Sequence, residues 1–254
     1  MSSDLNPRTW LSDLSTANGL LTRLPLGGAQ DEWDSARATR VYPLIGALVG
    51  LIGGGAYWLC QLLSLPTLLS ALIAVAATIL VTGAFHEDGL ADVADGLGGG
   101  GDKARKLAIM RDSRIGSFGV IALVLSIALR AAALAALVAA GSVIVSLIVA
   151  HAVARGLLPA IMAFLPLARG DGLASGTGRP EARHALSALG FAAIIAFAAL
   201  GLGGGLLALL AAALGAGSVA LLARAQIGGY TGDVLGAAEQ GAEIVVLLAV
   251  VASL

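Results

Sequence analysis

Four carboxylates fall within nine residues of a chain that is otherwise poor in charge. If residues 86–96 form a helix, Asp88, Asp92 and Asp95 follow an i, i+4, i+7 pattern and lie on one face. A bound divalent cation would relieve their mutual repulsion, and oxygen ligands of this kind suit Mg²⁺ or Mn²⁺ better than zinc. The stretch therefore predicts a magnesium site in which Glu87 and the three aspartates are candidate ligands, with the aspartates as candidate catalytic residues. The alternative is a solvated acidic helix face between two membrane spans.

A basic stretch follows the acidic one after a run of glycines at 98–101. It places five basic residues within twelve positions, namely Lys103, Arg105, Lys106, Arg111 and Arg114. Carboxylates that hold a metal, beside cations that neutralise phosphate oxygens, are the groups that phosphoryl or nucleotidyl transfer requires. The same cluster is also an ordinary topology signal in a membrane protein. The sequence has no Ser-His-Asp order, zinc-ligand spacing or Walker loop, so hydrolase and ATPase functions have no support.

Several ionisable groups fall inside apolar stretches, where such groups are costly and usually functional. His151 and Arg155 are i, i+4 and share a helix face. They are predicted to bind substrate, because a guanidinium there can hold a phosphate or the carboxylates of the acidic stripe, which is the face formed by Asp88, Asp92 and Asp95. Arg130 has no polar neighbour in sequence and is predicted to be structural, paired with an acid across the bundle. His86 adjoins the acids and is a candidate for orienting a carboxylate or holding a phosphate.

The composition indicates an integral membrane protein. Of 254 residues, 58% are hydrophobic and 12% are charged, against about 25% charged in soluble domains. The net charge of −1 gives no reason to expect a nucleic-acid partner. We expect an all-α, polytopic helix bundle in the lipid bilayer, with residues 1–254 forming a single membrane domain.

Apolar stretches predict about seven membrane spans. The expected spans are 41–63, 67–85, 117–139, 142–167, 187–214, 218–236 and 241–254, preceded by an amphipathic interfacial segment over 1–40. The stretch 187–214 is taken as one tilted span, with a broken pair of helices as the alternative because of the glycines at 201 and 203–205. Segment 86–116 lies between the second and third spans and is the predicted catalytic stretch. Its basic residues place it on the cytoplasmic side of the inner membrane. The same topology brings Asp233 to that face. Gly46, Gly50 and Gly54 form a close-packing seam that fits either a homo-oligomer or an internal helix pair.

Five blocks of the sequence resemble the cobalamin synthase family, whose activity is adenosylcobinamide-GDP ribazoletransferase. The two most specific are HEDGLADVADG at 86–96 and RKLAIMRDSRIGSFG at 105–119. The weaker blocks, in the order of the family, are LLTRLP at 20–25, RVYPLIG at 40–46 and GGYTGDVLGA at 228–237. The resemblance therefore covers most of the chain.

The resemblance implies a Mg²⁺-dependent transfer late in the assembly of the cobalamin nucleotide loop. A ribose hydroxyl of α-ribazole, or of its 5′-phosphate, would attack the cobinamide-bearing phosphorus of adenosylcobinamide-GDP. GMP would leave, and adenosylcobalamin or its 5′-phosphate would form.

The resemblance also implies roles for single residues. The implied metal ligands are Asp88, Asp92 and Asp95, with Glu87 or Asp233 completing a second site. The implied ligands of the diphosphate or of GMP are Arg105, Arg111 and Arg114, with Asp112 orienting an arginine. One carboxylate of the stripe would accept the proton of the attacking hydroxyl.

Three other functions remain open at this point. A membrane transporter would use the acidic stripe as a cation path. A CDP-alcohol phosphotransferase is suggested by the DxxDG pattern at 92–96, although neither the expected Ala-Arg pair nor a GxxxDxxxD sequence follows it. A non-catalytic scaffold for other corrinoid enzymes would tolerate neutralisation of the stripe.

Overall fold

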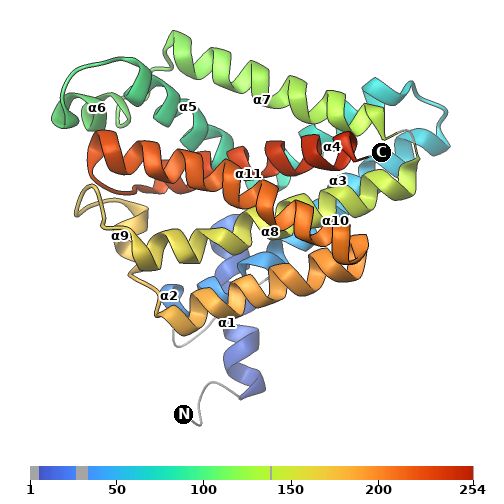
Figure 1. Ribbon diagram of the computed structural model, residues 1–254, viewed down its shortest axis with the longest axis horizontal. Helices are drawn as coiled ribbons and strands as arrows, with labels where there is room; N and C mark the ends of the chain where they lie inside the picture. The colour runs from blue at the N-terminus through green and yellow to red at the C-terminus, as the bar shows by residue number, and fades with distance from the viewer. Residues whose placement is uncertain (1–5, 27–33, 138, 254) are drawn as a thin grey trace.

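The computed structural model describes residues 6–26, 34–137 and 139–253, and their secondary structure is helical apart from one bridge between Leu167 and Tyr230 (Figure 1). The all-α prediction is confirmed. The longer helices are α1 (Pro7–Leu21), α3 (Tyr42–Leu62), α4 (Thr67–Thr82), α5 (Phe85–Gly98), α7 (Ser117–Ala136), α8 (Ala140–Phe164), α10 (Ala182–Ile227) and α11 (Gly232–Ala252). The short ones are α2 (Ser35–Ala38), the 3₁₀ helix η1 (Thr39–Val41), α6 (Lys103–Ile109) and α9 (Leu173–Thr177).

Five of the described helices are long and apolar enough to cross a membrane, and they include α3, α7, α8, α10 and α11. The pair α4 and α5 adds a sixth if it counts as one span that bends by 92°. Gly83 and Ala84 make this bend, since both have positive φ angles, 67° and 59°. The protein is thus a multi-pass helix bundle, and the first four predicted spans correspond to α3, α4, α7 and α8.

The C-terminal spans differ from the prediction. Helix α10 has 46 residues, which at 1.5 Å per residue is about 70 Å, roughly twice the hydrocarbon core of a bilayer. It is broken at Gly201, whose φ of 69° and ψ of −177° are non-helical, and Figure 1 shows the chain turning back there. The single span expected over 187–214 is therefore wrong, and the structure shows the alternative, a broken pair of helices. The predicted span 218–236 is also wrong, because residues 228–231 are a loop and α11 begins at Gly232.

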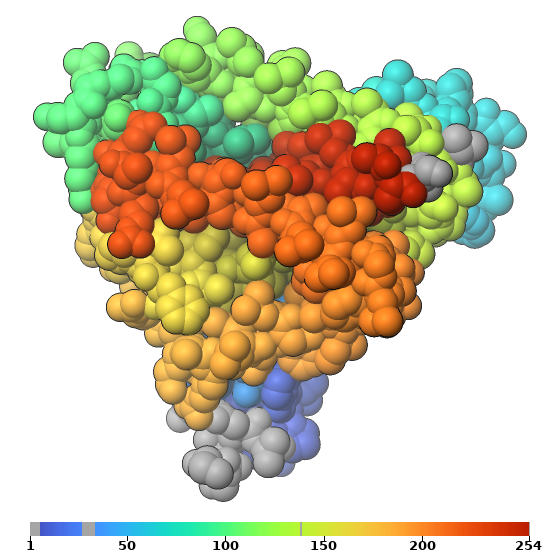
Figure 2. Space-filling view, viewed as in Figure 1, coloured from blue at the N-terminus to red at the C-terminus, as the bar shows by residue number. Residues whose placement is uncertain are grey.

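The surface separates into apolar sides and one polar end. Large apolar side chains are exposed along α7 and at every fourth residue in the second part of α10, as Leu202, Leu206, Leu210 and Leu214. Such stripes would be costly in water and fit contact with lipid. Figure 1 shows α6, α9 and the α10–α11 connection gathered at one end of the molecule, on the left, and Figure 2 shows the surface of these segments at the same end.

The glycine seam of α3 belongs to an internal helix pair. A Cβ atom at Gly46 would overlap the carbonyl group of His151, and one at Gly50 would overlap that of Leu147. Helices α3 and α8 therefore approach backbone to backbone, which only glycine permits. Of the two alternatives that the sequence left for this seam, the structure shows the internal pair.

The N-terminal helix is joined to the bundle by charge. Asp13 is buried and lies 2.9 Å from Arg37 Nε and 2.6 Å from Arg40 Nε. The guanidinium of Arg40 in turn stacks 3.8 Å from the ring centroid of Trp10. The described part of the predicted interfacial segment is therefore held to η1 and α2 by a buried ion-pair cluster, and residues 1–5 and 27–33 lie outside the described chain.

Candidate active site

The acidic stretch forms α5, and two glycines bring it against α11. A Cβ at Gly89 would lie 2.7 Å from the carbonyl oxygen of Asp233, and one at Gly236 would lie 3.2 Å from His86 Cα. This contact places Asp233, in the first turn of α11, beside the acidic stripe. The charges of Asp88 and Asp233 are close enough to act on the carboxylate of Asp92.

The acids face the basic loop across a cleft of about 450 Å³. Helix α5 contributes Glu87, Asp88 and Asp92, and the loop after α6 contributes Arg111, Asp112 and Arg114. Asp88 is exposed and Asp92 is half-buried, so both carboxylates are reachable from the cleft. The structure thus brings together two groups of predicted site residues from adjacent parts of the sequence.

The donor set of this cleft fits a hard divalent cation. Asp88, Asp92 and Asp233 offer only carboxylate oxygens, from two helices. Within the described chain, the three acidic or histidine side chains whose ligand atoms lie within 4.8 Å of one another are His151, Glu239 and Glu243, not these aspartates. The three aspartates therefore do not bind one ion together in this arrangement, and Mg²⁺, which keeps several of its waters, would take one or two of them as direct ligands.

Asp95 caps the N-terminus of α7. Its Oδ2 accepts a hydrogen bond from the Gly116 N–H at 2.7 Å, and its Oδ1 accepts one from the Gly119 N–H at 2.9 Å. A Cβ on either glycine would overlap these oxygens. Asp95 therefore joins α5 to the N-terminus of α7, where a negative charge is favourable. Its role as a metal ligand stays a prediction.

A row of ion pairs lies on the α11 side of the stripe. Nη2 of Arg111 donates to both carboxylate oxygens of Asp171. Asp171 Oδ1 lies 3.6 Å from Arg169 Nε, and Arg169 Nη2 donates to Asp233 Oδ2 at 3.2 Å. Arg169 and Asp171 were not predicted as site residues, because nothing in their spacing relates them to the acids of segment 86–96.

The remaining basic residues occupy different surroundings. The side chain and backbone N–H of Arg114 bind the Asp112 carboxylate and lower the pKa of Asp112 to about 2. Asp112 is therefore paired with Arg114, and its role in orienting an arginine toward the substrate stays a prediction. Arg105 is exposed on α6 and does not line the cleft.

Glu87 belongs to a buried network beneath the cleft. Its Oε1 accepts hydrogen bonds from Arg130 Nη2 at 3.0 Å and from Gln240 Nε2 at 3.2 Å. Arg130 Nη1 also donates to Glu243 Oε1 at 3.2 Å. Arg130 is thus paired with acids across the bundle, as predicted. Glu87 Oε2 has no hydrogen-bond partner among the described residues, so Glu87 keeps one oxygen that could serve a metal.

The predicted pair His151 and Arg155 lies in the same network, away from the cleft. His151 Nδ1 is 2.9 Å from Arg155 Nη1 and 3.2 Å from Glu243 Oε2. Arg155 pairs with Glu239, and its Nη2 lies 3.4 Å from His86 Nδ1. Binding of substrate by His86, His151 or Arg155 therefore stays a prediction. Glu239 and Glu243 were overlooked, although their i, i+4 spacing in an apolar helix was a usable signal.

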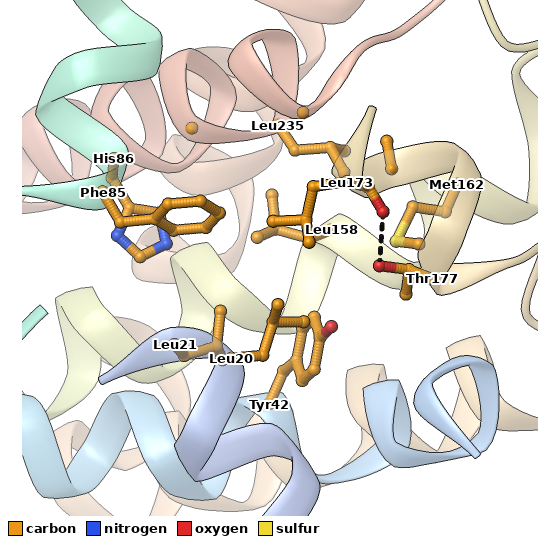
Figure 3. A pocket seen from close by; sticks show the side chains of 13 residues that line it. Leu20, Leu21, Tyr42, Phe85, His86, Leu158, Met162, Leu173, Thr177 and Leu235 are labelled. Atoms are coloured by element: carbon orange, nitrogen blue, oxygen red, sulfur yellow. Dashed lines mark hydrogen bonds between the residues drawn. The ribbon is translucent and has the colours of Figure 1, made fainter. Parts of the chain in front are cut away.

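A second, small pocket lies on the other side of His86. It has a volume of about 30 Å³, enough for a water molecule or two. Figure 3 shows Phe85 and His86 on one side of it and Met162 and Thr177 on the opposite side. Its lining is mostly apolar, and its polar residues are Tyr42, His86 and Thr177.

Comparison with known proteins places these features in a family. The family described as cobalamin-5-phosphate synthase matches residues 13–251. The adenosylcobinamide-GDP ribazoletransferase of Bradyrhizobium diazoefficiens is 47% identical over 243 residues, which is 95% of this chain and 94% of the relative. The proteins of the same name from Mesorhizobium japonicum and Xanthobacter autotrophicus are 42% and 44% identical, over 96% and 94% of this chain and 94% and 95% of the relatives. No solved structure matches the chain.

Proposed function

The chain belongs to the cobalamin-5-phosphate synthase family, and we propose that it transfers the cobinamide phosphate of adenosylcobinamide-GDP to α-ribazole or to α-ribazole 5′-phosphate. GMP is the second product, and adenosylcobalamin or its 5′-phosphate is the first. The chain is therefore a transferase of cobalamin biosynthesis, and the proposal concerns its substrates, its metal and the side of the membrane on which it acts.

The observation that carries the proposal is the cleft between α5 and the basic loop. It brings Asp88 and Asp92 opposite Arg111, with Asp233 and Arg169 beside them. Carboxylates alone would repel a diphosphate, and arginines alone would bind it without activating it. Both together, at one polar end of a membrane protein, support transfer between phosphate groups.

Mg²⁺ is the proposed cofactor, held by Asp88 and Asp92 with Asp233 or Glu87. When bound, it would supply positive charge to the diphosphate oxygens and help a hydroxyl to ionise. The protein's own part is to hold these carboxylates in one place, which it does through the Gly89 and Gly236 contact between α5 and α11.

The chemical step is a displacement at phosphorus. A bond forms between the ribose hydroxyl oxygen and the cobinamide-bearing phosphorus, and the bond from that phosphorus to the bridging oxygen breaks. The bridging oxygen keeps the electron pair and leaves with GMP. A carboxylate of the acidic stripe that does not bind the metal would accept the hydroxyl proton.

We place the cleft on the cytoplasmic face of the inner membrane. The loops that carry Arg111, Arg114, Arg169 and Arg179 lie at the same end as the cleft, and loops rich in arginine and lysine stay on the cytoplasmic side. Nucleotide substrates and Mg²⁺ are available there.

The test is GMP release from adenosylcobinamide-GDP and α-ribazole by the purified, detergent-solubilised chain. We expect release that requires Mg²⁺, stops with excess chelator, and falls at least a hundred-fold in Asp92→Asn. Glu181→Gln is the matched control, because Glu181 is exposed and pairs with Arg183 rather than with the cleft.

The other functions predict different results in the same preparation. A transporter would show saturable counterflow of a solute in vesicles without GMP release. A CDP-alcohol phosphotransferase would release CMP from a CDP-alcohol donor. Full activity in a well-folded Asp92→Asn variant would reject the assignment of the acidic stripe.

A further inference from the structure

Arg169 lies in the loop between α8 and α9, and the backbone holds this loop in place. The Tyr230 N–H donates to the Pro166 carbonyl at 2.9 Å, and the Ala168 N–H donates to the Tyr230 carbonyl at 2.8 Å. A Cβ at Gly229 would overlap the Pro166 carbonyl. The two strand-like segments are therefore locked together, and Arg169 is fixed directly beside the first turn of α11.

The guanidinium of Arg169 has donors that the described residues do not use. Nη2 donates to Asp233 Oδ2, but Nε and Nη1 are buried and make no hydrogen bond within the described chain. Asp171, at 3.6 Å from Nε, is close enough for charge attraction and too far for a hydrogen bond. Leaving buried N–H groups of a charged side chain without acceptors is costly. These donors therefore require an acceptor from outside the described residues.

The missing acceptor is most simply an anion. Arg169 is only 16% exposed and its charge acts on Asp92 as well as on Asp233. A guanidinium has a planar fork of donors that matches the oxygens of a phosphate, and it has no acceptor of its own. Arg169 thus presents unused donors next to the carboxylates to which a metal-bound diphosphate would come.

We propose that Arg169 binds oxygens of the diphosphate group of the substrate, a role that rests on the transferase reaction proposed above. During displacement, the bond from the attacked phosphorus to the bridging oxygen breaks and its electron pair stays on the leaving phosphate. Negative charge therefore grows on that phosphate, and a fixed arginine stabilises it more strongly than it stabilises the bound substrate. Arg169 accordingly affects kcat more than KM.

A purely structural role for Arg169 makes a different prediction. An arginine that served only as the counter-ion of Asp233 would influence the folding of the loop but not the affinity for phosphate. Its replacement would then change the thermal stability and leave binding of a diphosphate unaltered. Measuring a ligand affinity separately from turnover distinguishes the two roles.

The experiment compares Arg169→Gln and Arg169→Lys with the wild-type chain in detergent. The first readout is binding of inorganic pyrophosphate in the presence of Mg²⁺, measured by isothermal titration calorimetry. We expect Arg169→Gln to weaken binding at least about ten-fold and to lower kcat for GMP release about a hundred-fold, with Arg169→Lys in between. Arg183→Gln is the control, because Arg183 lies in an exposed ion pair with Glu181, and it should match the wild type.

The outcomes separate this proposal from the proposed reaction. If the wild type releases no GMP but binds pyrophosphate through Arg169, the reaction is wrong and the phosphate site stands. If Arg169→Gln binds pyrophosphate as tightly as the wild type, the site is wrong even when turnover is lost. If Arg169→Gln does not fold, Arg169→Lys decides, and wild-type affinity and kcat in that variant would also reject the site.

Discussion

Arg130 of α7 donates a hydrogen bond to Glu87 of α5, with 3.0 Å between Nη2 and Oε1, at the residue directly before Asp88. The same guanidinium reaches Glu243 of α11, and Gln240 of α11 also donates to Glu87. Three helices therefore meet at one buried carboxylate. This arrangement fixes the rotation of α5 about its axis and turns Asp88 toward the cleft.

Replacing Glu87 with glutamine should destabilise the protein. The side chains of Arg130 and Glu87 are 1% and 8% exposed, and removing one partner of a buried ion pair typically costs about 3–5 kcal/mol because the other charge is left without compensation. We expect a lower midpoint of thermal unfolding in detergent. Glu181→Gln, which breaks an exposed pair, should change stability by less than about 1 kcal/mol. Equal midpoints for the two variants would show that the buried pair does not hold α5.

A methyl group at Gly89 should separate the two acidic helices. In Gly89→Ala the new Cβ would lie 2.7 Å from the Asp233 carbonyl oxygen, so α5 or α11 must move and the carboxylates of Asp92 and Asp233 must part. We expect a higher Mg²⁺ concentration for half-maximal GMP release. Gly190→Ala is the control, because its Cβ meets open space within α10, and alanine favours the helix by about 1 kcal/mol. An unchanged Mg²⁺ dependence in Gly89→Ala would argue against a metal shared between α5 and α11.

The parts of the site that the sequence analysis predicted are those that depend on local spacing. The i, i+4 relation of Asp88 and Asp92 follows from the helical period alone, and the helix is confirmed. Helix packing determines the rest. The third aspartate of the stripe, Asp95, is only a turn away, yet the approach of Gly116 and Gly119 diverts it to the end of α7.

Long-range contacts explain what the sequence analysis did not find. Arg169 meets Asp233 because two loops pair through Pro166 and Tyr230. The periodicity of apolar and polar residues in the sequence does not predict such pairing between loops. A break near Gly201 was an alternative from the sequence, but the residue types do not tell which glycine adopts a positive φ, and the structure has the break at Gly201. The sequence shows that Glu243 is an acid within an apolar helix, but it does not show its partners, which come from α7 and α8.

Asp95→Asn tests whether Asp95 is a cap or a metal ligand. An asparagine side chain has one acceptor oxygen, so its amide NH₂ must face the N–H of Gly116 or of Gly119. We expect a loss of about 1–2 kcal/mol in unfolding free energy, with an unchanged Mg²⁺ dependence of activity. Thermal unfolding and a Mg²⁺ titration of GMP release measure the two quantities. A stable variant with a much weakened response to Mg²⁺ would make Asp95 a metal ligand.

Arg111 and Asp171 form an ion pair whose two members should differ in importance. The side chains are 52% and 62% exposed, and exposed pairs contribute about 0–1 kcal/mol to stability, so neither replacement should change the unfolding midpoint appreciably. Arg111 lines the cleft, whereas Asp171 accepts hydrogen bonds from the Arg111 guanidinium when no phosphate is bound.

We expect Arg111→Gln to lower kcat/KM for adenosylcobinamide-GDP about ten-fold or more, because a charged hydrogen bond to the diphosphate is lost. Asp171→Asn should retain the wild-type kcat/KM or exceed it. In that variant Arg111 does not have to give up the Asp171 carboxylate before it binds the diphosphate. Steady-state kinetics at two ionic strengths measure this difference, and similar losses in both variants would mean that the pair acts as a structural unit rather than as a releasable phosphate ligand.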